Sequence, residues 1–122
     1  MTNNYQYQEL FKLKTKRFAV RTLRLYNALP QKDDARILGK QLIRSTTSVA
    51  ANYRAACRAR SISEFAAKIG IALEEADESL FWLELLEESG ILPTSSLSEI
   101  KKEAAELTAI LTKARKTAVS KK

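Results

Sequence analysis

The scarcity of glycine and proline is the feature that most constrains what this chain can fold into. Three glycines (Gly39, Gly70 and Gly90) and two prolines (Pro30 and Pro93) occur among its 122 residues. Glycine permits sharp turns and proline interrupts helices and central strands, so regular elements have few places to end. The sequence therefore predicts a few long elements, and a chain of this length can bury one hydrophobic core as a single domain.

Apolar residues recur at spacings of three and four through most of the chain, which predicts helices rather than strands. The expected helices cover about residues 7–28, 35–59, 62–89 and 97–114, followed by a frayed basic tail over residues 116–122. Short connections between long helices make neighbouring helices antiparallel. The predicted fold is therefore all-α, an antiparallel up-down-up-down four-helix bundle that occupies residues 1–122 as one domain.

Signals for helix starts and ends support these bounds. Asp33 or Asp34 is expected to cap the second helix. The segments Ser61–Glu64 and Ser96–Glu99 both have the pattern of a capping box, in which a serine and a glutamate satisfy backbone N–H groups reciprocally. Gly90 is expected to end the third helix, because glycine readily adopts the left-handed conformation that follows a helix.

The first helix has a clear inward face. The residues predicted to form its centre are Phe11, Thr15, Phe18, Thr22 and Leu25. A second set is expected to widen the same face and so to enter the core: Leu10, Leu13, Val20, Leu23 and Tyr26. The resulting apolar stripe is the signature of a helix that packs against a core.

The formal net charge of +7 is distributed unevenly along the chain. Lysine and arginine dominate residues 1–60 and 101–122, whereas aspartate and glutamate dominate residues 61–100. A basic surface favours binding to nucleic acid, but segregated charge also permits neutralisation between neighbouring helices or subunits. Both uses remain open from the sequence.

The basic residues of the first helix form a candidate nucleic-acid-binding surface. Lys14, Arg17, Arg21 and Arg24 follow one another at spacings of three and four, which places them on one side of the helix. The C-terminal lysines and three further arginines are candidates to extend the surface: Arg54, Arg58 and Arg60. Such a stripe would bind RNA or DNA through phosphates and without sequence specificity. The alternative is a solvated face, or a partner for the acidic helix of an adjacent subunit.

Polar residues on the second and third helices form a candidate internal network. Its members are Gln41, Arg44, Ser48 and Asn52 on the second helix, and Glu75 and Glu78 on the third. Half-buried charges are tolerated only when they are paired, so Arg44 is expected to pair with Glu75 or Glu78 and to fix the helix register. The alternative is a solvated charged face.

No residue set in the chain points to catalysis, a metal or a cofactor. The chain has no histidine, which removes the usual general base, the Ser-His and Cys-His nucleophile pairs and the Glu-x-x-His pairs of di-metal bundles. The glycines are isolated, so no phosphate-binding loop is present. We therefore expect no enzyme activity, no metal site and no cofactor.

Cysteine content and hydropathy bear on the location of the protein. Cys57 is the single cysteine, which excludes an internal disulfide and is consistent with a reducing cytoplasm. No apolar run approaches the roughly 20 residues of a membrane helix, and the N-terminal segment lacks the apolar region of a secretory signal. We expect a cytoplasmic protein with no membrane contact.

Residues 38–92 carry a set of motifs that resembles a known family. The matching elements are Gln41-Leu42 with Arg44, Ser48-Val49, Asn52, Ser63-Glu64-Phe65, Glu75-Ala76-Asp77-Glu78 and Trp82-Leu83. Together they resemble the bacterial four-helix-bundle proteins encoded by intervening sequences in 23S ribosomal RNA genes. Many members have Asn-Ile-Ala-Glu-Gly where this chain has the segment Asn52–Ala56, which indicates a different branch.

The resemblance implies a homo-pentamer without established enzymatic activity. It also implies kinship with the accessory variability protein of diversity-generating retroelements, in which a basic pentamer contacts nucleic acid and a reverse transcriptase. The leading hypothesis is therefore a non-enzymatic homo-oligomeric scaffold that binds nucleic acid, or a nucleic-acid-associated protein, through a basic surface. The alternative is a purely protein-binding or structural oligomer with no nucleic-acid role.

Overall fold

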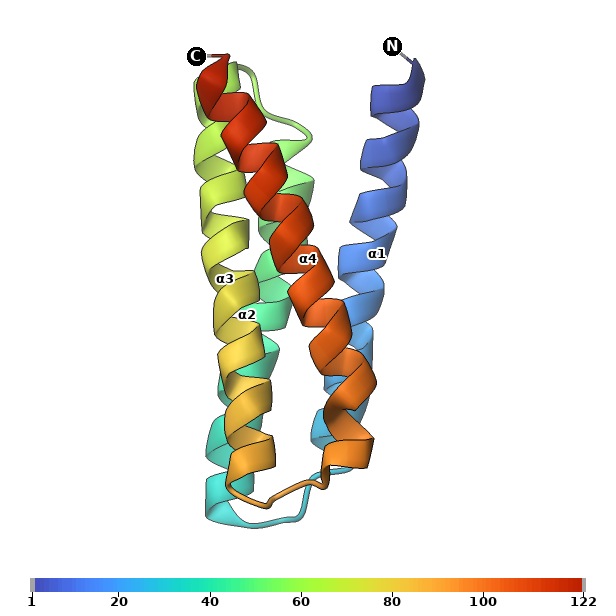
Figure 1. Ribbon diagram of the computed structural model, residues 1–122, viewed down its shortest axis with the longest axis vertical. Coiled ribbons are helices and arrows are strands. Elements are labelled where there is room, and N and C mark those ends of the chain that lie inside the picture. Colours follow the sequence, from blue (N-terminus) through green and yellow to red (C-terminus); the bar gives the residue numbers. More distant parts are fainter. Residues whose placement is uncertain (1, 122) are drawn as a thin grey trace.

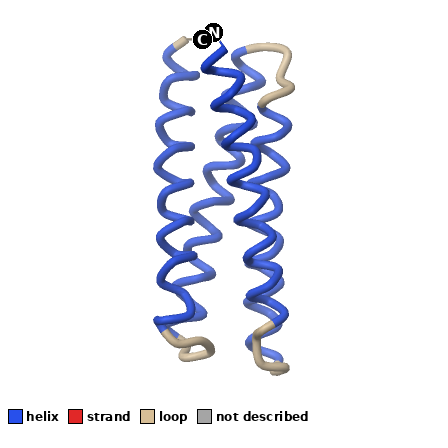
Figure 2. The backbone as a smooth tube through the Cα atoms, turned by 90° about the vertical axis from the view of Figure 1, so that its right-hand side faces the viewer, coloured by secondary structure: helices blue, strands red, loops and turns tan. Residues whose placement is uncertain are grey.

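The computed structural model describes residues 2–121, with side chains described from Tyr5 to Lys121. Over these residues it contains four α-helices: α1 (Thr2–Asn27), α2 (Asp33–Ala56), α3 (Ile62–Glu88) and α4 (Thr94–Ser120). Successive helices run in opposite directions, so the two ends of the chain and the α2–α3 loop lie at one end of the bundle (Figure 1). Figure 2 shows the loops confined to the two ends of four rods. The predicted all-α four-helix bundle is confirmed.

The helix bounds differ from those predicted mainly at the chain ends. The helix α1 begins at Thr2 rather than near residue 7, and α4 continues to Ser120. The expected frayed tail over residues 116–122 is therefore wrong as far as Ser120, and Lys122 lies outside the described residues. Ala118 explains the extension, because it is buried against the bundle and gives the last turns of α4 an apolar contact.

One of the two predicted capping boxes forms. The Ser61 hydroxyl accepts a hydrogen bond from the Glu64 backbone N–H at 3.0 Å, as expected. The Glu64 carboxylate accepts from the Arg60 backbone N–H at 2.9 Å, one residue before the cap. The box expected at Ser96–Glu99 is wrong, because α4 begins at Thr94 directly after Pro93. Proline fixes φ near the helical value and so favours an early helix start.

Two other helix ends follow simple backbone rules. Asp33 and Asp34 lie in the first turn of α2, and the N-cap itself is Lys32, so the predicted aspartate cap is wrong by one residue. Carboxylates in a first turn still interact favourably with the positive end of the helix dipole. Gly90 ends α3 with φ of 78°, a left-handed conformation that favours glycine.

The core runs along the axis of the bundle and receives side chains from all four helices. Its largest fully buried side chains include Phe18, Leu42, Ile69, Leu83 and Leu107. Two polar residues join it: the Thr22 and Thr46 hydroxyls hydrogen bond to each other at 2.7 Å between α1 and α2. Each hydroxyl also contacts a backbone carbonyl of its own helix, Ala19 at 2.8 Å and Ile43 at 3.3 Å, so both buried groups have hydrogen-bond partners.

The helix α1 turns an apolar stripe to the outside, contrary to the prediction that these residues widen the core face. Leu10, Leu13, Val20 and Leu23 are between 39% and 68% exposed. The helix packs mainly against α2 and only slightly against α4, so its inward face is narrow and holds Phe11 and Phe18. Of the predicted second set, Tyr26 packs against the core. We call the four exposed residues the outer stripe of α1.

Candidate nucleic-acid interface

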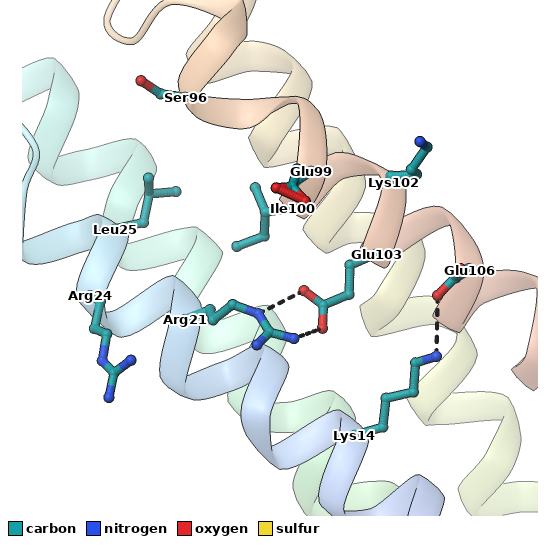
Figure 3. Close-up of a pocket in the computed structure, with 10 residues that line it drawn as sticks. All are labelled: Lys14, Arg21, Arg24, Leu25, Ser96, Glu99, Ile100, Lys102, Glu103 and Glu106. Atoms are coloured by element: carbon teal, nitrogen blue, oxygen red, sulfur yellow. Dashed lines mark hydrogen bonds and ion pairs between the residues drawn. The ribbon is translucent and has the colours of Figure 1, made fainter.

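Two of the four predicted basic residues on α1 form ion pairs with carboxylates of α4. The Arg21 guanidinium forms a two-pronged ion pair with Glu103, in which Nε donates to Oε1 at 3.0 Å. The Lys14 ammonium lies 3.1 Å from a Glu106 carboxylate oxygen. Figure 3 shows both pairs crossing a groove of about 820 Å³ between the two helices. The hydrogen bond from Arg21 to Glu103 raises the pKa of Arg21. The pair joins the two helices, because Arg21 lies on α1 and Glu103 on α4.

The other two basic residues of the stripe remain exposed. Arg17 and Arg24 form no ion pair with any described residue. In Figure 3 the Arg24 side chain points away from the carboxylates of α4. The stripe that the helical spacing predicts is therefore divided. Lys14 and Arg21 hold two helices together, whereas Arg17 and Arg24 face outward.

A group of exposed basic residues lies where the chain ends and the α2–α3 loop meet (Figure 1). Its members come from α2, the loop and α4: Arg54, Arg58, Arg60, Lys113, Arg115, Lys116 and Lys121. All are exposed. Arg60 has a neighbouring carboxylate, that of Glu64 at 3.9 Å, and the others form no ion pair with a described residue. We call this set the basic end of the bundle.

Sequence reasoning found only part of the basic end. It singled out Arg54, Arg58 and Arg60, and it named the C-terminal lysines only as a possible extension. The antiparallel fold brings the α4 residues Lys113 and Lys116 to the same end as the α2–α3 loop. The sequence shows that the end of α2 with the following loop and the end of α4 are both basic. It does not show that they are neighbours, because this depends on the lengths and directions of the helices.

A second groove, also of about 820 Å³, opens at the basic end between α1 and α4. We call it the terminal groove. The residues that line it are Tyr7, Gln8, Phe11, Tyr53, Ile62, Phe65, Ile110, Lys113, Ala114, Thr117, Ala118 and Lys121. Its surface is mainly apolar and aromatic, and its charged lining residues are both lysines. Sequence reasoning missed this groove, because it depends on the angle between two helices that are far apart in the sequence.

Tyr53 forms part of the floor of the terminal groove. Its ring packs edge-on against Phe11 with centroids 4.6 Å apart, and the side chain is almost fully buried. Burial raises the pKa of the Tyr53 phenol well above its ordinary value, and the nearby Cys57 adds to the effect. Burial also raises the pKa of the Cys57 thiol. Both groups are therefore neutral near pH 7 and act as packing residues.

The raised pKa of Tyr53 predicts a loss of stability in alkaline solution. Below the ordinary tyrosine pKa of about 10 the phenol is neutral in both states, and above it only the unfolded chain ionises. The free energy of unfolding should then fall by up to about 1.4 kcal/mol per pH unit. Urea denaturation at pH 9 to 11 should show a weaker pH dependence for Tyr53→Phe than for the wild type. Tyr5→Phe, at an exposed position, should behave like the wild type; equal slopes for all three would contradict the burial effect.

Ion pairs and hydrogen bonds divide the predicted polar network between α2 and α3 into two groups, one around Arg44 and one formed by Ser48 and Asn52. Arg44 reaches Glu78 at 2.8 Å and Glu75 at 3.5 Å. On α2, Arg44 also contacts the Gln41 side chain at 3.4 Å, and the Asn52 amide donates to the Ser48 hydroxyl at 3.0 Å. The Arg44 and Glu78 side chains are about half exposed, so their ion pair is solvated, whereas the Glu75 side chain is mostly buried. The role of these ion pairs in fixing helix register stays a prediction.

The described residues also bear on metal binding and on membrane insertion. Within residues 2–121, no three His, Cys, Asp or Glu side chains are arranged so that they would hold a metal ion. None of the helices in this range has the long apolar stretch that is needed to cross a membrane.

Known proteins place this fold and sequence in one family. The family model described as 23S rRNA-intervening sequence protein matches residues 10–113. The chain is 35% identical to a protein of unknown function from the S23 ribosomal protein family of Bacteroides thetaiotaomicron VPI-5482, whose crystal structure was determined at 1.70 Å. The two structures superimpose with a TM-score of 0.82 over 89% of this chain and 97% of the other. A comparison with curated proteins found no match. The chain therefore belongs to the 23S rRNA-intervening sequence protein family.

Proposed function

We propose that this protein is a non-enzymatic homo-oligomeric scaffold that binds nucleic acid through the basic end of the bundle. The observation that carries the proposal is the convergence of exposed, unpaired lysines and arginines from α2, the α2–α3 loop and α4. Positive charges that have no carboxylate partners bind phosphates and release counterions. Arg17 and Arg24 add two further exposed charges on α1, and Arg24 lies toward the other end of the bundle. Contacts to phosphates carry no base information, so binding is expected to be independent of sequence.

The test is a gel-retardation titration with a generic duplex at several salt concentrations. The affinity should fall steeply with salt, and the variant with Arg54→Gln, Arg58→Gln and Lys116→Gln should reduce the slope of log K against log salt by about three. The matched control neutralises three exposed residues at the opposite end of the bundle: Lys32→Gln, Arg36→Gln and Lys40→Gln. It removes the same charge and should leave the slope nearly unchanged. Equal losses in both variants would indicate a response to net charge alone, against a defined surface.

Self-association is the second part of the proposal, and the outer stripe of α1 supports it. Four large apolar side chains, exposed along one helix face, form the kind of patch that marks a protein interaction site. Lys16 and Arg17 flank the stripe. A second copy of the chain offers a complementary surface on α3, where Ile71 and Phe81 are exposed beside Glu74, Asp77 and Glu78.

The helices α1 and α3 lie at opposite corners of the bundle, since each packs against α2 and α4. A contact between α1 of one copy and α3 of the next is therefore heterologous, and such contacts build a ring when the rotation between copies closes. Opposite charges beside the apolar residues would fix the orientation of the two copies.

Light scattering tests this assembly. Leu13→Glu with Val20→Glu should lower the molecular mass to that of the monomer, because burying two carboxylates in an apolar contact is costly. Ile37→Glu, at an exposed position on α2, should leave the mass unchanged. Circular dichroism checks that both variants keep their helices. A wild-type monomer at tens of micromolar would contradict the oligomeric part of the proposal.

A structural oligomer without nucleic-acid binding is the second candidate. It is favoured by the ion pairs of Lys14 with Glu106 and of Arg21 with Glu103. These pairs engage two of the four basic residues of the stripe in contacts within the same chain. This candidate predicts assembly by light scattering with no retardation of RNA or DNA at low salt. The gel-retardation titration and the light-scattering measurement together therefore separate the candidates.

A further inference from the structure

We infer that the terminal groove holds unpaired bases of a single-stranded nucleic acid, with phosphates bound by the lysines on its α4 edge. This inference rests on the proposed function and adds to it a binding site and a class of ligand. The groove lies within the basic end, so a strand attracted by the surrounding charge would reach it directly.

The aromatic lining of the groove supplies stacking surfaces. Tyr7 and Phe11 lie one turn apart on α1 with their rings nearly parallel, at an interplanar angle of 9° and a centroid distance of 6.4 Å. Phe11 is buried and held edge-on by Tyr53, whereas Tyr7 is 55% exposed. The Phe11 ring is thus fixed by packing, and the Tyr7 ring is available at the opening of the groove. Aromatic side chains placed in this way bind bases of any sequence, because every base has a π-face.

Charge selects for a polyanion over an uncharged apolar ligand. Among the described residues, no aspartate or glutamate lines the groove, and Lys113 and Lys121 lie on its α4 side. These lysines are two helical turns apart, which corresponds to about 12 Å along the helix axis. A stacked strand rises about 3.4 Å per nucleotide, so the two ammonium groups span roughly three nucleotides. The other basic residues of the basic end would continue the path of the phosphates.

The volume and lining of the groove favour a single strand over a duplex. Its volume of about 820 Å³ lies in the range of sites that enclose much of a ligand, about 300–1,000 Å³. Bases inside a duplex are stacked on each other and cannot enter such a site without being extruded, which weakens the binding of a duplex there. Duplexes are therefore expected to bind only the outer charges, whereas single strands bind both the charges and the groove.

The experiment is a fluorescence-anisotropy titration with labelled oligo(dT), oligo(U) and a duplex of equal phosphate number. The wild type should bind the single strands more tightly than the duplex. Tyr7→Ala should weaken single-strand binding by about tenfold, a loss within the range measured for one stacked base. Duplex binding should not change. Tyr7→Phe should retain the wild-type affinity, because stacking needs the ring and not the hydroxyl.

Tyr5→Ala is the matched control, since Tyr5 is also exposed on α1 but does not line the groove. It should bind single strands like the wild type. A further variant, Lys113→Gln with Lys121→Gln, should lower the single-strand salt slope by about 1.4. Circular dichroism verifies that each variant is helical.

The possible failures are distinguishable. Equal affinity for single strands and duplex, or equal behaviour of Tyr7→Ala and Tyr5→Ala, would overturn the role of the groove and leave the basic end as a nucleic-acid surface. Absence of binding to all three probes by the wild type would overturn the proposed function and this inference together.

Discussion

Replacing Ile69 with alanine is expected to lower the free energy of unfolding by about 2–5 kcal/mol. Ile69 is fully buried in the core on α3, so the change removes apolar contacts and leaves a cavity that the surrounding helices fill only in part. The stability of a domain of this size is about 5–15 kcal/mol, which makes this loss a large fraction of the total. Urea denaturation at a fixed protein concentration measures it.

Ile37 provides the control, because it has the same side chain and also lies within a helix but is 62% exposed on α2. Ile37→Ala should change the free energy of unfolding by no more than about 0.5 kcal/mol. Similar losses at both positions would show that the inward face of α3 is not packed as described. The fixed concentration matters, because self-association adds to apparent stability by mass action.

The second large effect is expected at Gly39, where α1 and α2 approach each other closely. A Cβ atom added there would lie 2.5 Å from Tyr26 Cδ1 and 2.7 Å from Leu29 Cδ1. Both distances are shorter than any ordinary contact, so Gly39→Val forces the Tyr26 ring and the Leu29 side chain out of their packed positions. Overpacking of this kind costs about 1–3 kcal/mol.

Gly70→Val is the matched comparison, since both glycines lie inside helices and both changes carry the same helix propensity. A Cβ at Gly70 would meet the Arg115 side chain at 3.1 Å, and this long side chain can move aside. We expect Gly70→Val to leave the melting temperature nearly unchanged and Gly39→Val to lower it clearly. The opposite order would contradict the close approach of Tyr26 to α2.

The local features of the fold could be predicted from the sequence because they depend on residues close together in the chain. Helical periodicity, the Ser61 cap and the Gly90 stop are properties of short segments, and all three agree with the structure. The predicted bounds of α4 were wrong where residues outside the local pattern decided where the helix starts and ends. Packing of Ala118 extended α4 past the predicted end, and Pro93 started α4 before the serine that matched a capping pattern.

The candidate site was less predictable than the helices. The spacing of Lys14, Arg17, Arg21 and Arg24 correctly places them on one side of α1, but spacing contains no information about which helix lies opposite. The carboxylates of Glu103 and Glu106, on the last helix, decide that Lys14 and Arg21 are paired. The prediction that the outer stripe of α1 enters the core was likewise wrong, because apolar content does not show which side of a helix its neighbours cover.

The amino-acid sequence by itself determined four long helices, one core and a division of charge, because helix period, end signals and composition act over a few residues. Only the tertiary structure decided which basic side chains stay free, which apolar face of α1 is exposed, and that an aromatic groove opens at the basic end. These features depend on the directions of and angles between helices, which bring together residues as distant in the chain as Tyr7 and Lys121.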